Sequence, residues 1–417
     1  MSDREGHLLP DIVERHAAEA AFCWSYRDAA VRSPAYDLAE LCDLDDRLEC
    51  HMDGLRAAGD LGWELCLVEL SDPYPGVLFP ATILAVERRD WPGFARVLDA
   101  GATDPARARA LSSALGFLPF EALGVVWTGM LAQGSPAPLL HLAAAGHAIH
   151  RRDPGPPLAR LATDSDPRVR ARALRAVGEL SRTDLLRLLI DSLSDPDETI
   201  QLCAAWSAVL LRDSRGAATL ATLALNSPSH AEEACAMAVR ALPPADARRL
   251  VEQVAARPDL VRAALRGAAA LGDPALLPWL ASQAAVPETA RLAAFAIRLI
   301  TGASEDDLSG AGKPPEGFDS GPTDDPDDED VSEDPDSDLP WPDPARLTAF
   351  LASVRLPEGT RHLLGKPMEP VRLRQLLRSG NQAVRAACAV ELTLRLRGEP
   401  LFEVRAPGYR QLAALPS

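Results

Sequence analysis

Prolines recur through the middle of the chain at intervals of 29 to 32 residues. The positions are Pro105, Pro136, Pro167, Pro196, Pro228, Pro258 and Pro287. Three of these prolines follow Asp and two follow Ser. Such a pair starts a helix, because the side-chain oxygen accepts from a free backbone N–H and proline lacks the N–H that would stay unbonded. A period of about thirty residues is typical of repeat proteins.

The segments that follow these prolines have helical periodicity. After Pro167, the side chains of Val169, Leu174 and Val177 fall on one face and charged residues fall on the other. Shorter apolar segments lie between these helices, so each interval predicts two helices joined by a turn. Because one pair cannot bury its apolar face alone, neighbouring pairs must stack. We expect seven stacked helix pairs between about residues 104 and 301, without β-strands.

An apolar residue followed by Arg recurs close to the predicted helix starts. The pairs are Val169-Arg170, Val261-Arg262, Ala290-Arg291 and Val384-Arg385. Together with the Asp-Pro starts, they resemble HEAT repeats, in particular the short variety of about thirty residues noted in bilin-lyase-type proteins. The resemblance implies an all-α, HEAT-like α-solenoid. It also implies that the Arg of each pair bonds acidic or carbonyl groups in the adjacent turn.

The sequence on either side of the repeats is also helical but lacks the thirty-residue period. The helices expected there span residues 10–31, 38–58, 61–70, 343–354, 370–377 and 382–396. The predicted domains are a helical N-terminal cap or divergent repeats over 1–103, HEAT-like repeats over 104–303, an acidic linker over 304–340 and a C-terminal helical subdomain over 341–417.

The acidic linker interrupts the apolar pattern. Between Glu305 and Asp338 the chain has 15 acidic residues and one Lys, which accounts for −14 of the net charge of −17. Apolar side chains are scarce there, so burial cannot offset the entropy lost on ordering. We therefore expect residues 304–340 to be disordered and solvated. Trp341, directly after this segment, is a candidate for docking onto a partner or back onto the repeats.

The rest of the chain is close to neutral, which argues against binding of nucleic acid. The seven cysteines are scattered and no C-x-x-C motif occurs, so neither a disulfide framework nor a zinc site is expected. The sequence begins without a secretory signal and has no apolar stretch of the ~20 residues that span a bilayer. These features predict a cytoplasmic protein that binds no membrane and no nucleic acid.

Motifs for catalysis or cofactor binding are absent from the sequence. There is no G-x-S-x-G, no phosphate-binding loop and no G-x-G-x-x-G. Three of the eight histidines, His141, His147 and His150, lie close together, but no Cys or carboxylate accompanies them on the same predicted helix. The His-Glu dipeptides that HEAT-type di-iron hydroxylases use do not occur either. We therefore expect no enzyme activity, no metal ion and no cofactor.

Arginines on the repeat helices are the candidate binding residues. One helix has a polar stripe of three arginines, and two later helices continue the pattern. If such helices line a groove, the groove would bind an acidic segment of a partner, or the acidic linker of the chain itself. The alternative is an ordinary solvated helix face. The candidate residues are Arg168, Arg172, Arg175, Arg262, Arg266, Arg291 and Arg298.

Phrases spread over nearly the whole chain resemble one bacterial family of HEAT-repeat proteins. They include IVERHAAEAAFCWSYRDAAVRSP at 12–34, LDDRLECHMDGLRAAGDLGWELC at 44–66 and LFEVRAPGYRQ at 401–411. Genes of this family often lie near type VI secretion genes, which implies an accessory role beside effector or spike proteins. The predicted function is a non-catalytic scaffold or adaptor that binds a protein partner, and the resemblance implies a chaperone-like accessory of type VI secretion. The alternatives are a HEAT-repeat enzyme of the bilin-lyase or hydroxylase type and a HEAT-type nucleic-acid-binding protein.

Overall fold

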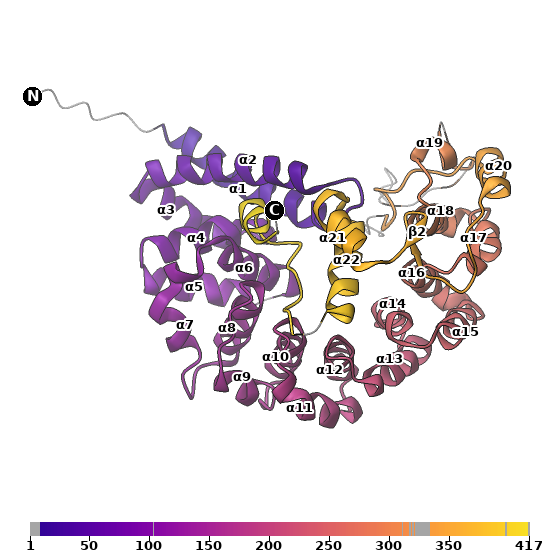
Figure 1. Ribbon diagram of the computed structural model, residues 1–417. Coiled ribbons are helices and arrows are strands. Elements are labelled where there is room, and N and C mark those ends of the chain that lie inside the picture. The colour runs from indigo at the N-terminus through magenta and orange to yellow at the C-terminus, as the bar shows by residue number, and fades with distance from the viewer. Residues whose placement is uncertain are drawn as a thin grey trace, which may run out of the picture. The chain divides into compact units, whose positions relative to one another are not determined.

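The computed structural model describes residues 9–102, 104–310, 312–316, 318, 321, 334–396 and 398–415. In these residues the fold is all-α apart from one two-stranded hairpin, as the sequence predicts (Figure 1). The chain forms two compact units. The first contains residues 1–176, 378–385 and 402–417, and the second contains residues 177–377 and 386–401.

The helices have the following bounds. The first unit contains α1 (Pro10–Ala30), α2 (Leu38–Ala57), α3 (Asp60–Val68), α4 (Leu78–Glu87), α5 (Trp91–Gly101), α6 (Pro105–Phe117), α7 (Gly124–Met130), α8 (Ala137–Ile149), α9 (Pro156–Leu161) and α23 (Gly408–Ala414). The second contains α11 (Leu186–Asp191), α12 (Glu198–Leu210), α13 (Ser214–Asn226), α14 (Ala231–Ala241), α15 (Pro244–Ala255), α16 (Val261–Leu271), α17 (Leu277–Gln283), α18 (Pro287–Thr301), α19 (Glu305–Leu308) and α20 (Pro344–Ser353). The helices that cross a unit boundary are α10 (Pro167–Glu179), α21 (Pro370–Ser379) and α22 (Gln382–Arg395).

The repeated prolines lie at helix starts or in the turns before them. Pro105, Pro167 and Pro287 are the first residues of α6, α10 and α18. Pro258 opens a 3-10 turn that leads into α16, and the remaining three precede α8, α12 and α14. Residues 104–301, all of which the structure describes, contain no β-strand. The predicted repeat pattern is confirmed in this span.

The number of helix pairs differs from the prediction at the end of the repeats. Six pairs, α6–α7 to α16–α17, alternate along the chain as expected. The helix that should complete the seventh pair with α18 is α19, which has only four residues. Gly302 ends α18 in the left-handed conformation. The acidic sequence after it supplies no apolar face for a full second helix.

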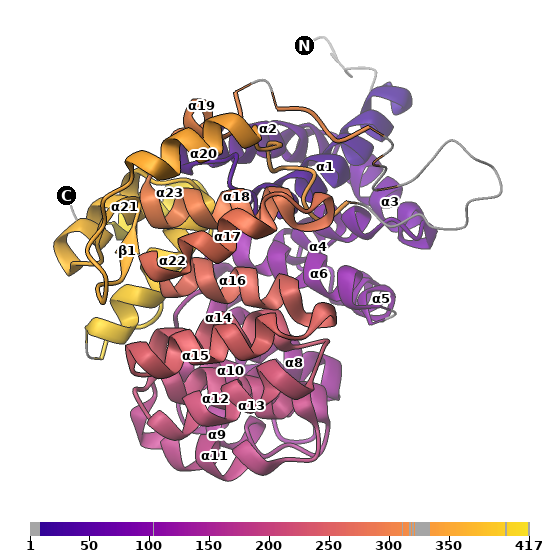
Figure 2. The same cartoon turned by 90° about the vertical axis from the view of Figure 1, so that its right-hand side faces the viewer.

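The helices of the second unit form two layers. α12, α14, α16 and α18 follow one another in one layer, and α11, α13, α15 and α17 form the other (Figures 1 and 2). Alanine and leucine fill the space between the layers, and small side chains let the helix backbones approach closely. At Gly267 of α16, an added Cβ would lie 2.4 Å from Sγ of Cys235 on α14. This contact explains why α16 has glycine at that position.

The hairpin caps two helices of the second unit. Its strands are β1 (His362–Leu363) and β2 (Lys366–Pro367), paired antiparallel. The backbone N–H of His362 donates to the carbonyl of Gly272 at the end of α16, and the two residues after β1 donate to carbonyls of α18. A helix leaves its last carbonyls without partners, so the hairpin satisfies them. The sequence predicts only helices in this region, so the hairpin was not expected.

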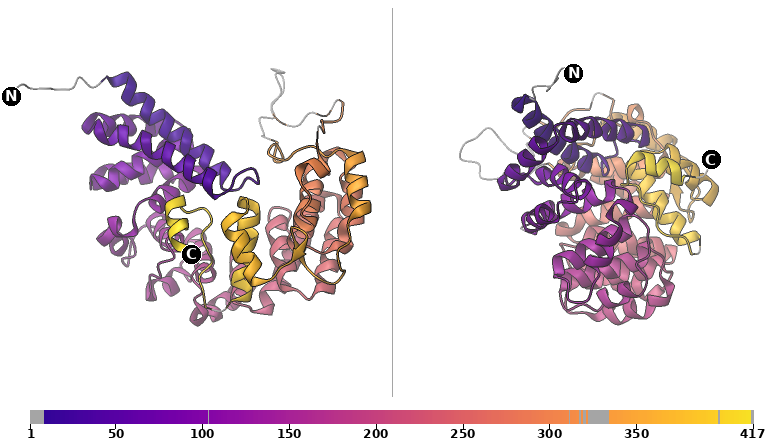
Figure 3. Two further views of the ribbon diagram at one scale, coloured as in Figure 1. Left: turned by 45° about the horizontal axis from the view of Figure 1, so that its top comes forward. Right: turned by 90° about the vertical axis from the view of Figure 1, so that its left-hand side faces the viewer.

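In the first unit, α1 packs against α2, and the two helices lie side by side (Figure 3). The end of the chain is also part of this unit. Arg27 of α1 is 3% exposed and donates to the backbone carbonyls of Arg405 (3.1 Å) and Ala406 (2.9 Å). The side chain of Gln382 donates to the carbonyl of Val31. These buried polar contacts hold residues 378–385 and 402–415 in the first unit, so residues 341–417 divide between the two units.

Glu391 of α22 anchors another part of the C-terminal region in the second unit. Its buried carboxylate forms ion pairs with Arg240 of α14 (2.6 Å), with Arg361 and with Arg395. Burial alone would raise the pKa of Glu391, but the three guanidinium groups lower it to about 2. The carboxylate is therefore ionised at neutral pH.

The acidic linker is ordered at its two described ends, contrary to the expectation. Ser304 caps α19, because its hydroxyl accepts from the N–H of Asp307 and its own N–H donates to the Asp307 carboxylate. Residues 334–340 contact α16 and α18 through specific ion pairs, which composition alone does not predict. For residues 322–333 the expected disorder falls outside the described residues. Within the described part of the chain, no helix has the length and apolar content needed to cross a bilayer.

Candidate partner-binding site

The three arginines of α10 do not form one exposed stripe. Arg168 is exposed and pairs with Asp166, the residue that starts its own helix, at 2.9 Å. Arg172 and Arg175 are half-buried. The neighbouring Arg170 donates to the carbonyl of Asp164 at 2.6 Å, in the turn before α10. On α10, Arg168 is thus the one candidate with a fully exposed side chain.

The four other candidates lie on α16 and α18, which are neighbours in one layer of the second unit. Arg262 and Arg266 are on α16, and Arg291 and Arg298 are on α18. Arg266 lies 3.5 Å from the Glu232 carboxylate, and Arg298 is half-buried near the end of α18. Arg262 and Arg291 both bind the acidic linker. We call residues 334–341 the acidic turn.

Arg262 binds the acidic turn through a two-pronged (bidentate) contact. Its two terminal nitrogens donate to the two carboxylate oxygens of Asp336, at 2.7 and 2.8 Å. A planar guanidinium matches a carboxylate in this geometry, and such paired, charge-assisted bonds are stronger than neutral ones. The hydrogen bond that Arg262 donates to Asp336 raises the pKa of Arg262, and burial opposes that shift. Asp336 itself is only 3% exposed.

Arg291 contacts the same turn in three ways. It donates to the backbone carbonyl of Asp336 at 3.0 Å and forms an ion pair with Asp334. Its guanidinium lies 4.6 Å from the ring centroid of Trp341, a cation–π contact. Trp341 thus docks back onto the helical repeats, one of its two predicted roles. Arg291 is 7% exposed, so the turn covers it.

The acidic turn has a conformation of its own. The Asp334 carboxylate accepts from the N–H of Asp336 at 2.9 Å, and the Asp336 carbonyl accepts from the N–H of Leu339 at 2.8 Å. The Leu339 side chain is buried in the core of the second unit. The Asp-x-Asp sequence and Trp341 therefore contact the arginines of α16 and α18, and Leu339 packs in the apolar core beside them.

Two of the apolar–Arg pairs have their arginine at the same distance from the residue that starts the helix. Arg170 lies four positions after Asp166, and Arg385 lies four positions after Asn381, which start their helices. Arg385 has 0% exposure and donates to the side chain of Gln411. At this position the arginine serves the internal packing of its own unit. The implied role, bonding groups of an adjacent turn, applies to Arg170.

The two arginines that bind the acidic turn differ in their distance from the helix cap. Arg291 lies five positions after Val286, the cap of α18, and Arg262 lies two positions after Leu260, the cap of α16. Distance from the helix cap therefore does not by itself separate the two groups of arginines.

The clustered histidines are packing residues. His147 and His150 contact the rings of Phe120 and Trp127, and His141 bonds the carbonyl of Arg168. Burial lowers the pKa of each of the three, that of His150 to about 4. They are neutral at physiological pH. The described residues that could hold a metal ion are instead Glu19, Cys23 and His51, which the sequence analysis did not single out.

Asp334 and Asp336 were not predicted as individual binding residues. In the sequence they belong to a uniformly charged segment, and nothing in the composition distinguishes these two carboxylates from their thirteen acidic neighbours. One signal was present: they lie five and three residues before Leu339, where apolar side chains return.

Comparison with known protein families gives one match. Residues 156–240 match the family of HEAT repeats. The matched span begins with α9 and ends in α14, so it includes the arginines of α10 and stops before α16. Among curated proteins, none matches the chain. HEAT repeats generally mediate protein interactions, and this region of the chain has such repeats.

Proposed function

We propose that this protein is a non-catalytic, protein-binding scaffold whose arginines on α16 and α18 bind an acidic segment of a partner. The observation that carries the proposal is the two-pronged contact of Arg262 with Asp336, next to the contacts of Arg291 with Asp334 and Trp341. This contact shows which chemistry the arginines accept: an Asp-x-Asp turn followed by apolar residues.

The acidic turn of the chain is then a built-in occupant of the partner site. A partner segment with carboxylates in the same spacing would replace it. Extended repeat surfaces commonly bind peptide segments of other proteins. Ionic contacts across such a surface also make association faster and dependent on salt.

The resemblance to a bacterial family adds a setting to this proposal. In that setting the protein acts in the cytoplasm as an accessory of type VI secretion, and the acidic segment belongs to an effector or a spike protein. Affinity purification from the native cell, followed by mass spectrometry, tests the setting. The proposal requires a secretion protein that is captured by the wild-type chain and lost with Arg262→Gln/Arg291→Gln.

A peptide experiment tests the binding site itself. The probe is a fluorescent peptide with the sequence of residues 333–341, and its binding is measured by anisotropy. The protein carries Asp334→Asn and Asp336→Asn, which weaken the built-in occupant. We expect the peptide to bind this variant more tightly than it binds the wild-type chain, and to bind less tightly as salt rises.

Arginine variants in the same background identify the contacts. Arg262→Gln together with Arg291→Gln should abolish peptide binding, because both partners of the two carboxylates are lost. Arg168→Gln, which removes an exposed arginine of α10, is the matched control and should leave the affinity unchanged. Equal peptide affinity of the double arginine variant and its parent would refute the proposed site.

A further inference from the structure

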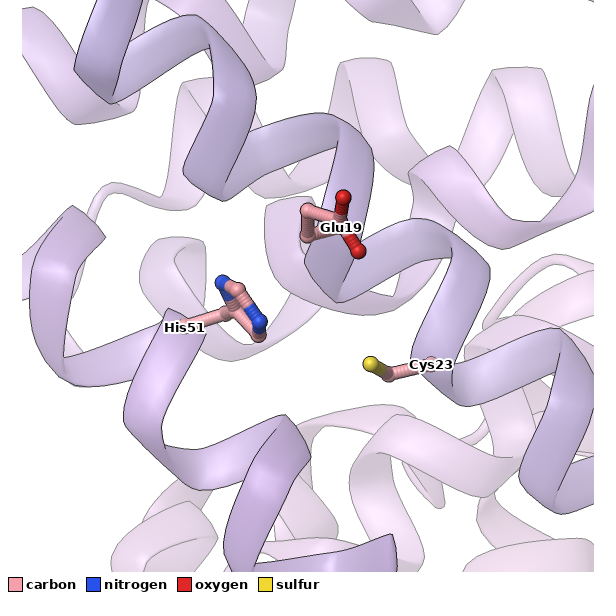
Figure 4. Close-up of side chains that lie close together, drawn as sticks. All are labelled: Glu19, Cys23 and His51. Atoms are coloured by element: carbon pink, nitrogen blue, oxygen red, sulfur yellow. The ribbon is translucent and has the colours of Figure 1, made fainter.

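Four side chains with metal-binding atoms meet between α1 and α2. His16, Glu19 and Cys23 are spaced by three and four residues, so they share one face of α1. His51 faces them from α2, as Figure 4 shows for Glu19, Cys23 and His51. A carboxylate oxygen of Glu19, Sγ of Cys23 and a ring nitrogen of His51 all lie within 4.8 Å of one another.

The three types of ligand atom suit one class of metal ion. Imidazole nitrogen, thiolate sulfur and carboxylate oxygen are the ligands of Zn²⁺ in proteins, and calcium and magnesium prefer oxygen alone. With metal–ligand distances of about 2.0–2.3 Å, the ligand atoms of a tetrahedral zinc site are about 3.3–3.6 Å apart. The ligand atoms of the three side chains need to approach one another by about 1 Å, which small rotations of the side chains allow.

His16 supports His51 from the other side. The Nδ1 atoms of the two rings are 3.2 Å apart, so one ring donates a hydrogen bond to the other. When Nδ1–H of His51 is the donor, its Nε2 keeps a lone pair for a metal ion. Ring nitrogens that bind metals in proteins commonly have such a partner on the opposite nitrogen.

The backbone of α2 makes room for His16. Gly54 lies directly against the imidazole, and an added Cβ would be 2.7 Å from its ring atoms. Around the group, Cys23 is buried, and Glu19 and His51 are half-buried. The thiol therefore lies in the interior of the helix pair and the other two groups are open to incoming metal.

We propose that Glu19, Cys23 and His51 bind one divalent transition-metal ion of the zinc class between α1 and α2. His16 is a positioning residue that fixes the tautomer and orientation of His51. Three protein ligands leave a fourth position for water or for a group from outside the chain. The ion would add a metal bridge between two helices that are also joined by the ion pair of Arg27 with Asp45.

Cobalt is the probe for this site, because Co²⁺ takes the place of Zn²⁺ and its visible spectrum reports coordination. The full-length protein, stripped with a chelator, is titrated with Co²⁺ and then with Zn²⁺. We expect one equivalent to bind, with the absorption of a four-coordinate ion and a thiolate-to-cobalt charge-transfer band in the near ultraviolet. Zinc should then displace the cobalt. Absence of stoichiometric binding would overturn the proposal.

Two cysteine variants test which thiol binds. Cys23→Ser should remove the charge-transfer band. Cys50→Ser should keep it, because Cys50 is an exposed neighbour of His51 on α2. Circular dichroism and thermal unfolding of the metal-free variants separate lost binding from lost folding. A band that survives Cys23→Ser or disappears with Cys50→Ser contradicts the assignment.

The remaining residues have distinct expected effects. Glu19→Gln and His51→Asn should each abolish stoichiometric binding. His16→Asn should weaken zinc binding by about 10- to 100-fold and preserve the four-coordinate cobalt spectrum, as loss of an outer partner does. A changed coordination spectrum in His16→Asn would show that His16 is a ligand and would refute its positioning role.

Discussion

Arg170 of α10 and Arg291 of α18 stem from the same sequence pattern, an apolar residue followed by Arg, but they bind different parts of the molecule. Arg170 donates to a carbonyl in the turn that precedes its own helix. Arg291 binds a segment more than forty residues further along the chain. A repeat signature therefore identifies a helix but does not predict which groups each of its residues contacts.

The arginines can therefore be sorted by what they hold. Arg170, Arg385 and the three arginines around Glu391 hold the helices and the C-terminal residues in place. Arg262 and Arg291 hold the acidic turn. Loss of a contact in the first group should reduce stability, and loss of a contact in the second should mainly change binding.

The largest effect is expected at Glu391. Glu391→Gln leaves Arg240, Arg361 and Arg395 without their buried counter-charge, and breaking such a pair costs about 3–5 kcal/mol. Chemical denaturation measures the free energy of unfolding. The exposed Glu369→Gln is the control and should change it by less than about 0.5 kcal/mol. If the two variants are equally stable, the cluster does not hold the fold.

Lowering the pH should remove the stabilisation that Glu391 contributes to the folded state. Its pKa is lowered from an ordinary 4.5 to about 2 in the folded chain, so the folded state favours the ionised form. The stabilisation is complete above about pH 4.5 and is lost as the pH falls to about 2, a change of about 3 kcal/mol. The difference in unfolding free energy between the wild-type chain and Glu391→Gln should shrink across this window. A difference that does not depend on pH would contradict the assigned ion pairs.

A smaller loss is expected for Arg170→Ala. It removes the hydrogen bond to the carbonyl of Asp164, and a bond from a charged donor contributes about 1.5–3 kcal/mol. Thermal or chemical unfolding detects the loss. Affinity for the acidic peptide should stay unchanged, because this hydrogen bond is made in the turn before α10. Weaker peptide binding with normal stability would instead assign Arg170 to the arginines that bind the acidic turn.

The smallest effect is expected for Trp341→Ala. This change removes the cation–π contact with Arg291, worth about 1 kcal/mol, or about fivefold in affinity. In the peptide of residues 333–341, the same substitution should raise the Kd by that factor. Arg291→Lys in the protein should then abolish most of the difference between the two peptides, because an ammonium lacks the planar face that stacks on the ring. If the two peptides still differ in affinity for Arg291→Lys, Trp341 contacts a residue other than Arg291 in the complex.

The sequence predicts much of the fold and less of the site. Periodicity and Asp-Pro starts are local signals, so they give helices such as α6 and α10 with accurate first residues. The buried position of Asp336 depends on its contact with Arg262, which lies 74 residues earlier in the chain. No local sequence pattern contains such a contact. The group on α1 and α2 is similar: the spacing of His16, Glu19 and Cys23 is visible, but His51 joins them only when the helices pack.

The acidic turn has a consequence for any ligand that competes with it. Because Asp336 and Arg262 belong to one chain, their encounter is intramolecular, and a tether commonly gives an effective concentration on the order of millimolar. An outside segment with the same contacts and no others would need a comparable concentration to replace the turn. The acidic turn thus sets a minimum affinity for ligands of this site. Acidic segments that bind weakly do not replace the turn, and a partner binds only if it makes additional contacts or binds through several acidic segments at once.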